Sequence, residues 1–468
     1  MTRIVKKNSA MNIPLPCGLS PTRLGGWLPK DPRYAGNWIR KLKKAVVQRP
    51  CKLVEPIREF QDMVYSDPVL YANVSMMFSE AHFREKFTPL GWESEVKDFD
   101  EFLQLLNAIM TTAPECFYTN TPGGEQPAGL IGFPINALLD WPMATTAGYD
   151  VFSNSLVNQQ FKKILNYWSS YLVTPESRYV LVQDDPAEQT IPWLGDTVRS
   201  WIVQVANSAV GEGSIGPFTS FEQIFQSTPQ DPYYGFASWD DFFTRKFVDG
   251  VRPISEPGDD NVIVNACESA PYALVPNVRT SAQFWLKDQA YSLENMLNWD
   301  EFTPQFVGGT VYQAFLSALS YHRWHSPVNG TIVKAYVVNG SYYLENLYQS
   351  FLNNDPDPTS PNNSQGFLTA VATRALIFIE ADNPAIGLMC VMHVGMAEVS
   401  SCDITVKPGD HVKKGDQLGM FHFGGSTYCL FFRPGVSLEF YLYGQTPGPQ
   451  AGTNIRVNTA IAKCLVKA

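Results

Sequence analysis

The sequence predicts an α+β fold in which an α-helical N-terminal domain precedes a β-rich domain. Hydrophobic residues make up 45% of the 468 residues and charged residues 17%, a balance that allows a large buried core. Apolar residues recur with helical spacing from about residue 38 to residue 172. Beyond residue 262 they form short runs and alternating patterns that are typical of strands. A chain of this length is expected to hold two domains.

The N-terminal half begins with an arm. Residues 1–35 are rich in proline and glycine, and we expect them to be extended and ordered only where they dock. Residues 36–230 are expected to form the helical domain. Its predicted helices lie at 57–64, 100–109, 159–172 and within 186–210. The segment 121–134 is rich in proline and glycine, so we predict a loop between helices there.

Residues 231–468 are expected to form the β-rich domain. A short helix is predicted at 239–243, and Asn329-Gly330 indicates a tight turn between strands. Strands are predicted at 331–338, 375–380, 387–394 and 437–443. The segment 406–416 holds two Gly-Asp pairs and resembles the hairpin of lipoyl-like folds.

Composition excludes several classes of partner. The formal net charge of −10 argues against nucleic acid and anionic lipid surfaces, because both require basic patches. The eight cysteines form no Cys-x-x-Cys pair, and we interpret them as reduced, mostly buried thiols of an intracellular protein. We expect no signal peptide and no transmembrane span, and therefore a cytoplasmic protein without stable membrane association.

The turn formed by Gly424, Gly425, Ser426 and Thr427 lies between two apolar runs. The hydroxyl of Ser426 adjoins the carbonyl of Gly425, which can be approached closely because glycine has no Cβ. Attack by Ser426 on that carbonyl would convert the peptide bond to an ester, and elimination and hydrolysis would leave a pyruvoyl group. Its ketone forms a Schiff base with an amine and accepts the electrons released on decarboxylation. An ordinary glycine-rich hairpin turn is the alternative.

Three other residues are candidates for catalysis. His322 and His325 stand three residues apart in a chain with only six histidines, and imidazole is the usual base near neutral pH. Glu268 is an acid in an apolar stretch, where it either faces solvent or orients a catalytic imidazole. The histidines are alternatively metal ligands or core residues, but no third ligand stands at a suitable spacing, so we expect no metal. The polar loop 353–366 is expected to be a flexible insert, with a cation site as the alternative.

Together these segments resemble the phosphatidylserine decarboxylase family of pyruvoyl enzymes. Residues 322–330 look like its His-Arg-x-His-x-Pro-x-x-Gly motif, and residues 394–399 are similar to its Val-Gly-Ala-x-x-Val segment. Residues 424–427 match its Leu-Gly-Ser-Thr cleavage site, with Gly424 in place of leucine. Glu268 stands where the family has Asp, which keeps the charge but lengthens the side chain by one methylene. Within the family, the chain looks most like the soluble fungal amino-acid decarboxylases, in particular the L-tryptophan decarboxylases of psilocybin biosynthesis.

The resemblance implies self-cleavage after Gly425. His325, oriented by Glu268, deprotonates Ser426, and the β chain (residues 1–425) and α chain (residues 426–468) stay associated. The pyruvoyl group derived from Ser426 is the implied cofactor, and no pyridoxal phosphate is needed.

The resemblance also implies the substrate, a free aromatic L-amino acid, with L-tryptophan as the first expectation and tryptamine as its product. His322 transfers a proton during decarboxylation. Gly424 leaves room beside the substrate, and Phe423 is a candidate to line its pocket.

Three alternatives remain open at this point. A phosphatidylserine decarboxylase would require a membrane anchor or a basic amphipathic helix, and neither is visible. A serine hydrolase using Ser426, His325 and Glu268 would keep an intact chain, but the Gly-x-Ser-x-Gly motif is missing. A non-enzymatic lipoyl-like binding module explains the Gly-Asp pairs but not the histidines together with Gly-Ser.

Overall fold

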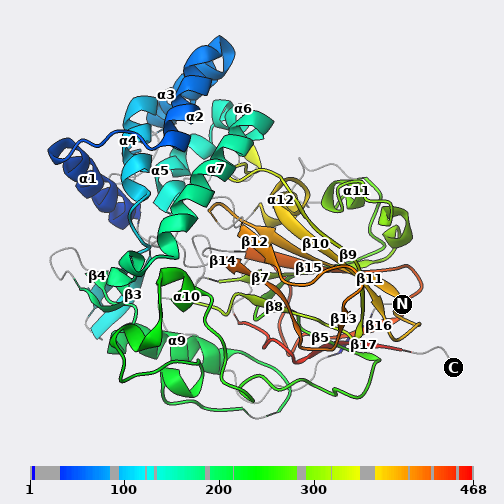
Figure 1. The fold of residues 1–468 in the computed structure, drawn as a ribbon. Helices are drawn as coiled ribbons and strands as arrows, with labels where there is room; N and C mark the ends of the chain where they lie inside the picture. The colour runs from blue at the N-terminus through cyan, green and yellow to red at the C-terminus, as the bar shows by residue number, and fades with distance from the viewer. Residues whose placement is uncertain are drawn as a thin grey trace.

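The computed structural model describes residues 3–5, 32–84, 94–121, 124–130, 134–184, 190–213, 215–281, 291–317, 319–347, 364–398, 401–422, 426–448 and 453–465. Most of the N-terminal helices gather at one end of the molecule, and the largest sheet lies at the other end (Figure 1). One continuous hydrophobic core joins the two parts, because it contains buried residues from Ile39 in the first helix to Cys464 in the last strand. Within these ranges, we find no helix that is both long and apolar enough to cross a membrane.

The helical part follows the apolar spacing of the sequence. Its helices are α1 (Pro32–Gln48), α2 (Glu55–Ser66), α3 (Pro68–Arg84), α4 (Phe99–Ile109), α5 (Pro134–Met143), α6 (Thr146–Ser153), α7 (Ser155–Leu172), α8 (Tyr179–Val182) and α9 (Asp196–Ser208). The helix α4 begins where the side chain of Asp98 accepts a hydrogen bond from the backbone of Glu101, at 2.9 Å. The predicted helices at 57–64, 100–109 and 159–172 are confirmed, and α9 lies within 186–210.

The prediction of a loop over 121–134 was wrong for residues 124–130, which form a strand. The strands β2 (Cys116–Thr121), β3 (Gly124–Leu130) and β4 (Thr190–Ile191) make a small antiparallel sheet in the order β3-β2-β4. Pro127 belongs to the edge strand, opposite Tyr118 and next to a register shift in β2. Proline is tolerated at a sheet edge or beside a bulge, and this explains why a proline-containing segment forms a strand.

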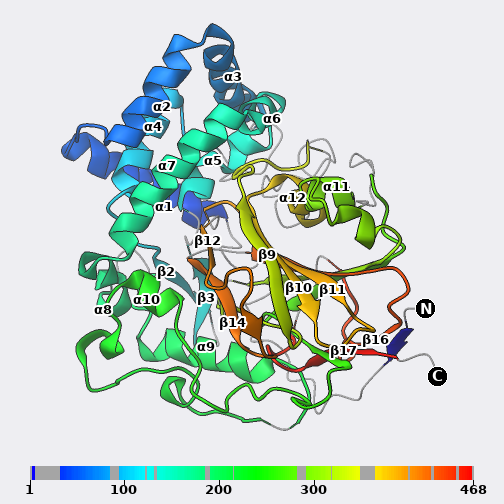
Figure 2. The same cartoon turned by 45° about the vertical axis from the view of Figure 1, so that its right-hand side comes forward.

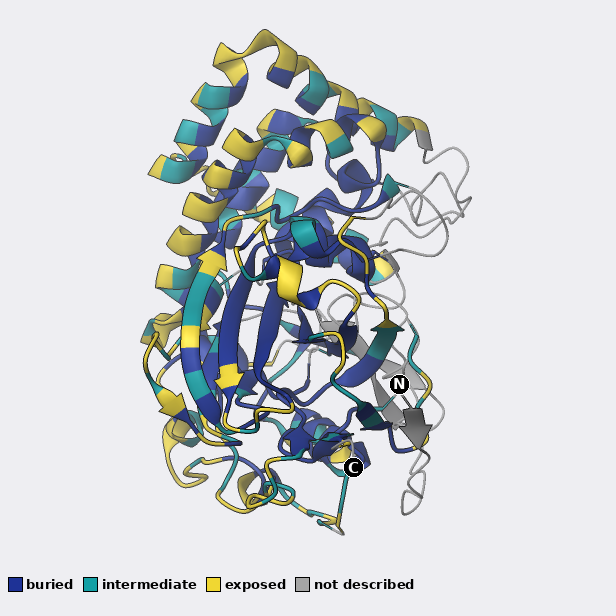
Figure 3. Cartoon of the chain, turned by 90° about the vertical axis from the view of Figure 1, so that its right-hand side faces the viewer, coloured by how far each residue is buried: buried dark blue, intermediate teal, exposed yellow. Residues whose placement is uncertain are grey.

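A seven-stranded sheet in the order β13-β9-β10-β11-β15-β7-β6 forms the centre of the β-rich part. Its strands are β6 (Ala270–Pro276), β7 (Thr310–Leu316), β9 (Gly330–Val338), β10 (Arg374–Ala381), β11 (Leu388–Gly395), β13 (His411–Val412) and β15 (Ser426–Phe432). The strands β7, β11 and β15 are buried at every position, as the dark blue centre of the sheet in Figure 3 shows. They therefore have continuous apolar sequences rather than alternating ones. The predicted strands at 331–338, 375–380 and 387–394 are confirmed.

A three-stranded sheet packs against this central sheet. Its strands are β8 (Arg323–His325), β12 (Ser401–Ile404) and β14 (Gln417–His422), in the order β12-β14-β8. Each Gly-Asp pair makes a turn in which the aspartate accepts a hydrogen bond from a lysine backbone, at 2.9 Å for Asp410 and 2.8 Å for Asp416. The glycines Gly409 and Gly415 have φ of 93° and 85°, a region that favours glycine. The likeness to a lipoyl-type hairpin remains a prediction.

A four-stranded sheet holds the described part of the N-terminal arm. Its strands are β1 (Arg3–Val5), β5 (Val262–Val264), β16 (Leu438–Tyr441) and β17 (Ala460–Cys464), in the order β1-β16-β17-β5. The strand β1 pairs parallel with β16, beside which it is drawn in dark blue in Figure 2. The prediction of a strand at 437–443 is confirmed for its central residues. Residues 6–31 of the arm lie outside the described residues.

Short helices connect the strands. They are α10 (Trp239–Phe243), α11 (Leu293–Met296), α12 (Gln365–Val371) and the 3-10 helices η3 (Pro175–Arg178), η5 (Phe221–Gln223), η6 (Pro232–Gly235) and η7 (Thr303–Phe306). The predicted helix at 239–243 is α10, where Ser238 accepts a hydrogen bond from the backbone of Asp241. The described cysteines are free, and all but Cys51 are buried.

Candidate active site

Ser426 is the first residue of β15, near the middle of the central sheet. It pairs with Gly395 at the end of β11 and with Leu316 at the end of β7. Its side chain is 0% exposed, and its Oγ has no hydrogen-bond partner among the described residues. Buried hydroxyls normally have a partner, and an exception requires an explanation. The prediction that this hydroxyl is consumed in forming a pyruvoyl group would account for the missing partner.

The next residue anchors this end of the strand. Thr427 donates a hydrogen bond from Oγ1 to the carbonyl of Ala314 (2.9 Å) and accepts one from Nε2 of Gln313 (2.9 Å). The hydroxyl of Tyr291 donates to Oε1 of the same Gln313 side chain. Successive side chains point to opposite faces of a sheet, so this network holds the strand on the face opposite to the Ser426 side chain.

The connection between β14 and β15 contains the candidate cleavage site. Phe423, Gly424 and Gly425 lie outside the described residues, so their expected roles remain predictions. The residues on either side of this connection both contact the segment between residues 316 and 322. The backbone N–H of Phe421 donates to the carbonyl of His322 (3.1 Å), and Ser426 pairs with Leu316, six residues earlier. This pairing brings His322 to the end of the sheet where Ser426 lies.

His322 is a neutral buried imidazole. Its side chain is 1% exposed and stacks on Phe243, with ring centroids 4.3 Å apart. Burial holds the pKa of His322 well below its usual value, and the nearby Arg245 guanidinium lowers it further. A neutral imidazole can accept a proton, as a general base must.

The structure does not join His325 to Ser426 by a hydrogen bond. Nδ1 of His325 lies 2.7 Å from the carbonyl oxygen of Gly415, and Nε2 lies 3.0 Å from the Tyr321 hydroxyl. Because a carbonyl only accepts, Nδ1 carries the proton and Nε2 accepts from Tyr321. Burial lowers the pKa of His325, so the ring is neutral.

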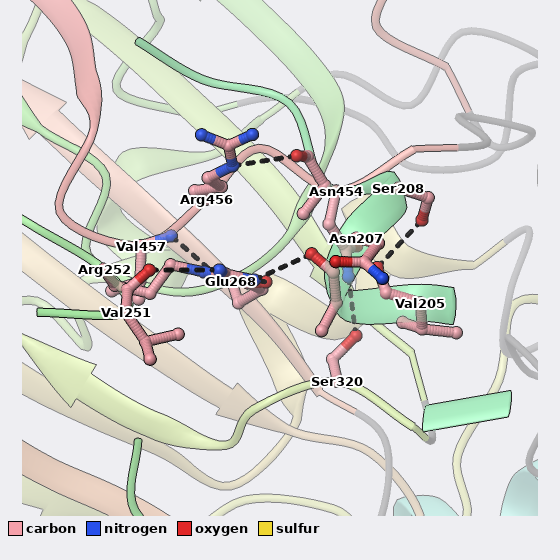
Figure 4. Close-up of polar contacts among 12 residues, drawn as sticks. Val205, Asn207, Ser208, Val251, Arg252, Glu268, Ser320, Asn454, Arg456 and Val457 are labelled. Carbon is pink, nitrogen blue, oxygen red and sulfur yellow. Dashed lines mark hydrogen bonds and ion pairs between the residues drawn. The ribbon is translucent and has the colours of Figure 1, made fainter. Parts of the chain in front are cut away.

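The expectation that Glu268 orients His325 is wrong for this structure. Arg252 donates two hydrogen bonds to the carboxylate of Glu268, from Nε to Oε2 (2.9 Å) and from Nη2 to Oε1 (2.6 Å). The backbone N–H of Val457 donates a third, to Oε2 at 3.1 Å (Figure 4). A guanidinium matches both oxygens of a carboxylate, whereas an imidazole can bind only one. Glu268 is nevertheless near His325, whose backbone N–H donates to Ala266 at 2.9 Å.

His393 is a buried histidine that sequence reasoning missed. It lies on β11 opposite Tyr428 and two residues before Gly395, so it shares a sheet face with Ser426. Its ring stacks on Trp324 with centroids 3.9 Å apart, and neither ring nitrogen has a hydrogen-bond partner among the described residues. Burial holds the pKa of His393 well below its usual value. The only sequence signal was a single polar residue within an apolar strand.

Glu398 is a second missed residue, three positions beyond Gly395. It is 0% exposed, and its Oε1 accepts a hydrogen bond from the backbone of Asn136 at the start of α5 (2.8 Å). Burial raises the pKa of Glu398 to about 8. Through this contact, the helical part of the chain reaches the end of the sheet where Ser426 lies. The sequence signal was an acid within the family-like segment 394–399.

A metal centre is not found in the part of the chain that the structure describes, since no three His, Cys, Asp or Glu side chains gather there. In the polar loop predicted at 353–366, residues 353–363 lie outside the described residues. The last two residues, Gln365 and Gly366, begin α12.

Comparison with known proteins identifies the family. Two family models, both described as phosphatidylserine decarboxylase, match residues 54–201 and 239–462. The L-tryptophan decarboxylase of Psilocybe cubensis is 34% identical over 447 residues, which cover 93% of each chain. The decarboxylase iboD of Amanita muscaria is 38% identical over 370 residues, or 77% of this chain and 99% of that protein. The phosphatidylserine decarboxylase proenzyme 3 of Schizosaccharomyces pombe is 29% identical over 231 residues, or 49% of this chain and 22% of that protein.

The matches cover both the helical and the β-rich parts of the chain. The chain therefore belongs to the phosphatidylserine decarboxylase family, whose members depend on a pyruvoyl group. It is a decarboxylase, a carboxy-lyase.

Proposed function

We propose that this chain is a proenzyme that cleaves itself between Gly425 and Ser426 and then decarboxylates a free aromatic L-amino acid, L-tryptophan in the first instance. The observation that carries the proposal is the buried, unpartnered hydroxyl of Ser426 at the start of β15. A nucleophile without a competing hydrogen bond is available to attack the preceding carbonyl.

The cleavage balances without an external reactant other than water. The oxygen of Ser426 attacks the carbonyl carbon of Gly425, and the amide becomes an ester. Elimination then breaks the bond between Cβ and the ester oxygen of Ser426 and releases the carboxylate of Gly425. Hydrolysis of the remaining enamine, through its imine tautomer, releases ammonia and leaves the pyruvoyl group. Once formed, that group supplies a ketone that condenses with an amine. It accepts the electron pair that stays behind when the substrate carboxylate leaves as carbon dioxide.

The two motif histidines are proposed to move protons. Both are neutral because burial lowers the pKa of each ring. His322 is proposed to act in decarboxylation. Its carbonyl accepts a hydrogen bond from the backbone of Phe421, and Leu316, six residues before it, pairs with Ser426, so both contacts hold it at this end of the sheet. His325 is proposed to act in self-cleavage. For His325 to accept a proton from Ser426, the hydrogen bond between its Nε2 and the Tyr321 hydroxyl would first have to break.

The two chains made by cleavage are proposed to stay together. All seven residues of β15 pair with β11 on one side and with β7 on the other. The strands β16 and β17, which follow β15, pair with each other and contribute to the same hydrophobic core. An α chain that begins at Ser426 would therefore keep both flanking strands.

The substrate proposal rests on the relatives, since the L-tryptophan decarboxylase of Psilocybe cubensis matches 93% of this chain. The test is to incubate purified wild type with L-tryptophan, L-tyrosine or L-phenylalanine, and separately with phosphatidylserine vesicles, and to measure the amine by mass spectrometry. Tryptamine from the wild type and none from Ser426→Ala is the expected result. Turnover of the lipid alone would favour the phosphatidylserine decarboxylase alternative. An intact wild-type chain that reacts with a fluorophosphonate at Ser426 would favour the hydrolase.

A further inference from the structure

His422 is the last residue of β14 and the last described residue before the connection to Ser426. Only three residues separate it from Ser426, the first residue of β15. A connection this short begins where His422 is held, so the position of His422 affects how the peptide bond before Ser426 is presented to its hydroxyl. Such positioning matters, because a misplacement of about 1 Å can slow a reaction by about 100-fold.

Both ring nitrogens of His422 face a carboxylate. Nδ1 lies 3.0 Å from each carboxylate oxygen of Asp240, which belongs to α10. Nε2 lies 3.5 Å from Oδ2 of Asp403, which belongs to β12. The side chain of Asp240 is 10% exposed and that of Asp403 is 48% exposed, so Asp240 makes the better shielded contact. Because a carboxylate only accepts hydrogen bonds, both contacts are satisfied when each nitrogen carries a proton, as in the imidazolium cation.

The charges around this contact favour the protonated ring. Among the described residues they are Asp240 and Asp241 on α10, Asp403 on β12 and Arg323 on β8, whose guanidinium interacts with all three aspartates. Burial has the largest single effect on the pKa of His422 and lowers it. The hydrogen bonds and charges of Asp240 and Asp403 together outweigh burial, so the pKa of His422 is raised above its usual value of 6.5.

The helix α10 links His422 to the candidate catalytic histidine. Asp240 and Phe243 stand three residues apart, so they lie on one face of this helix. Asp240 holds His422, and the ring of Phe243 stacks on His322 with centroids 4.3 Å apart. The end of β14 and the His322 ring are therefore both held by one short helix, which Figure 2 shows beside β14.

A second contact joins the same elements. Arg323 donates from Nε to the carbonyl of Thr244, directly after α10 (2.7 Å), and from Nη1 to Oε1 of Gln417, at the start of β14 (2.8 Å). Arginine keeps its charge through the neutral range, so this contact does not depend on pH there. Loss of the His422 proton would therefore loosen the end of β14 that precedes the connection, without releasing the start of the strand.

We propose that protonated His422, held between Asp240 and Asp403, is a positioning residue that fixes the end of β14 for self-cleavage. The inference rests on the proposed function for the self-cleavage itself. A neutral imidazole has one N–H group and can donate to only one of the two carboxylates. Its bare nitrogen then faces the other carboxylate, which repels a lone pair. Self-cleavage is therefore faster while His422 is protonated and slower once it is neutral.

The direction of this pH dependence distinguishes His422 from a general base. A histidine that accepts a proton from Ser426 must be neutral, so its titration makes cleavage faster as the pH rises. Burial lowers the pKa of both His322 and His325, which places any such rise below pH 6.5. Because the pKa of His422 is raised, its titration makes cleavage slower above pH 6.5. The rate should fall by about tenfold per pH unit beyond that pKa.

The rate of self-cleavage in freshly made chain tests the inference. Cell-free translation with a radiolabelled amino acid supplies the 468-residue chain, and synthesis is stopped before dilution into buffers of different pH. Gel electrophoresis follows its conversion to the β chain. We expect the decline above pH 6.5 in the wild type. His422→Gln can still donate to Asp240 but does not titrate, so it should lack the decline and cleave about 10-fold to 100-fold more slowly below it.

His411→Gln is the matched control. Nε2 of His411 also lies 2.9 Å from an aspartate, Oδ2 of Asp382. His411 belongs to β13, which three strands of the central sheet separate from β15. This variant should keep the rate and the pH profile of the wild type.

The protonation of His422 is measured separately in the uncleaved Ser426→Ala chain. Exchange of the imidazole C2 hydrogen for deuterium, read by mass spectrometry, gives the pKa of individual histidines. Asp240→Asn should lower the pKa of His422 more than Asp403→Asn does, because Asp240 is closer to the ring and more deeply buried. With Ser426 restored, Asp240→Asn should move the decline in cleavage rate to lower pH by the same amount.

A decline that persists in His422→Gln, or a decline that stays in place in Asp240→Asn, would overturn the inference. A His422 pKa at or below 6.5 in the uncleaved chain would also overturn it. Circular dichroism of the variants in the Ser426→Ala background checks that the fold is kept. A wild type that stays full length at every pH would overturn the proposed function as well, whereas cleavage with a profile independent of His422 would overturn the inference alone.

Discussion

Replacing Glu268 by alanine tests whether its carboxylate stabilises the fold by pairing with Arg252 or instead orients His325 for catalysis. The side chains of Glu268 and Arg252 are 4% and 2% exposed, and three hydrogen bonds end on the carboxylate. Glu268→Ala would leave the guanidinium buried without its anion. Breaking a buried ion pair by removing one partner lowers the free energy of unfolding by about 3–5 kcal/mol. Arg252 would keep the carbonyls of Ala206 and Val251, so we expect the lower part of this range.

Urea denaturation of Glu268→Ala, Arg252→Ala and the double variant measures this effect, all in the Ser426→Ala background so that cleavage does not intervene. The double variant should be less destabilised than the sum of the single variants, because either truncation breaks the same pair. Glu222→Ala, an exposed glutamate, is the matched control and should stay within about 0.5 kcal/mol of its parent. A Glu268→Ala chain that is as stable as its parent, yet fails to self-cleave when Ser426 is restored, would refute the stabilising role and support the role of Glu268 in orienting His325.

Two further predictions concern stability. A Cβ on Gly419 would lie 2.2 Å from the carbonyl oxygen of Asp403 and 2.7 Å from Cε3 of Trp324. Gly419→Ala should therefore lower the free energy of unfolding by about 1–3 kcal/mol in urea, whereas Gly258→Ala, where no atom lies within 4 Å, should not. Glu398 holds a proton in the folded chain up to pH 8 or so, because burial raises its pKa to about 8 from the usual 4.5. The unfolded chain releases that proton above pH 4.5, so this group makes stability fall by about 1.4 kcal/mol per pH unit between pH 6.5 and 7.5. In Glu398→Gln, the free energy of unfolding should fall less steeply with pH, by about 1.4 kcal/mol per pH unit over this range. Equal slopes in the two proteins would contradict the raised pKa of Glu398.

Local sequence was sufficient to predict several of the strands and helices, because the spacing of their apolar residues matches the side chains that are buried. The strands β11 and β15 are apolar at nearly every position, and both are buried on both faces. The strand β3 was missed because an edge position next to a register shift accommodates Pro127, and neither feature is visible in the segment itself.

The candidate site was predictable only in part. Motif spacing identified Ser426 and His322 as candidates, and pairing in the fold ties both to the same end of the sheet. The partner of Glu268 was not predictable, because Arg252 belongs to no motif and meets the carboxylate only after folding. Glu398 and His393 were missed because their significance lies in burial without a full set of partners, which only tertiary structure reveals. The cytoplasmic location stays a prediction.

The intact mass of the purified wild type under denaturing conditions tests self-cleavage most directly. We predict two fragments, split after Gly425, and a small fragment lighter by the mass of ammonia than one that begins with Ser426. Ser426→Ala should give a single full-length mass. A wild type that remains full length, or a small fragment that keeps an N-terminal serine, would contradict the proposal that this chain makes its own pyruvoyl group.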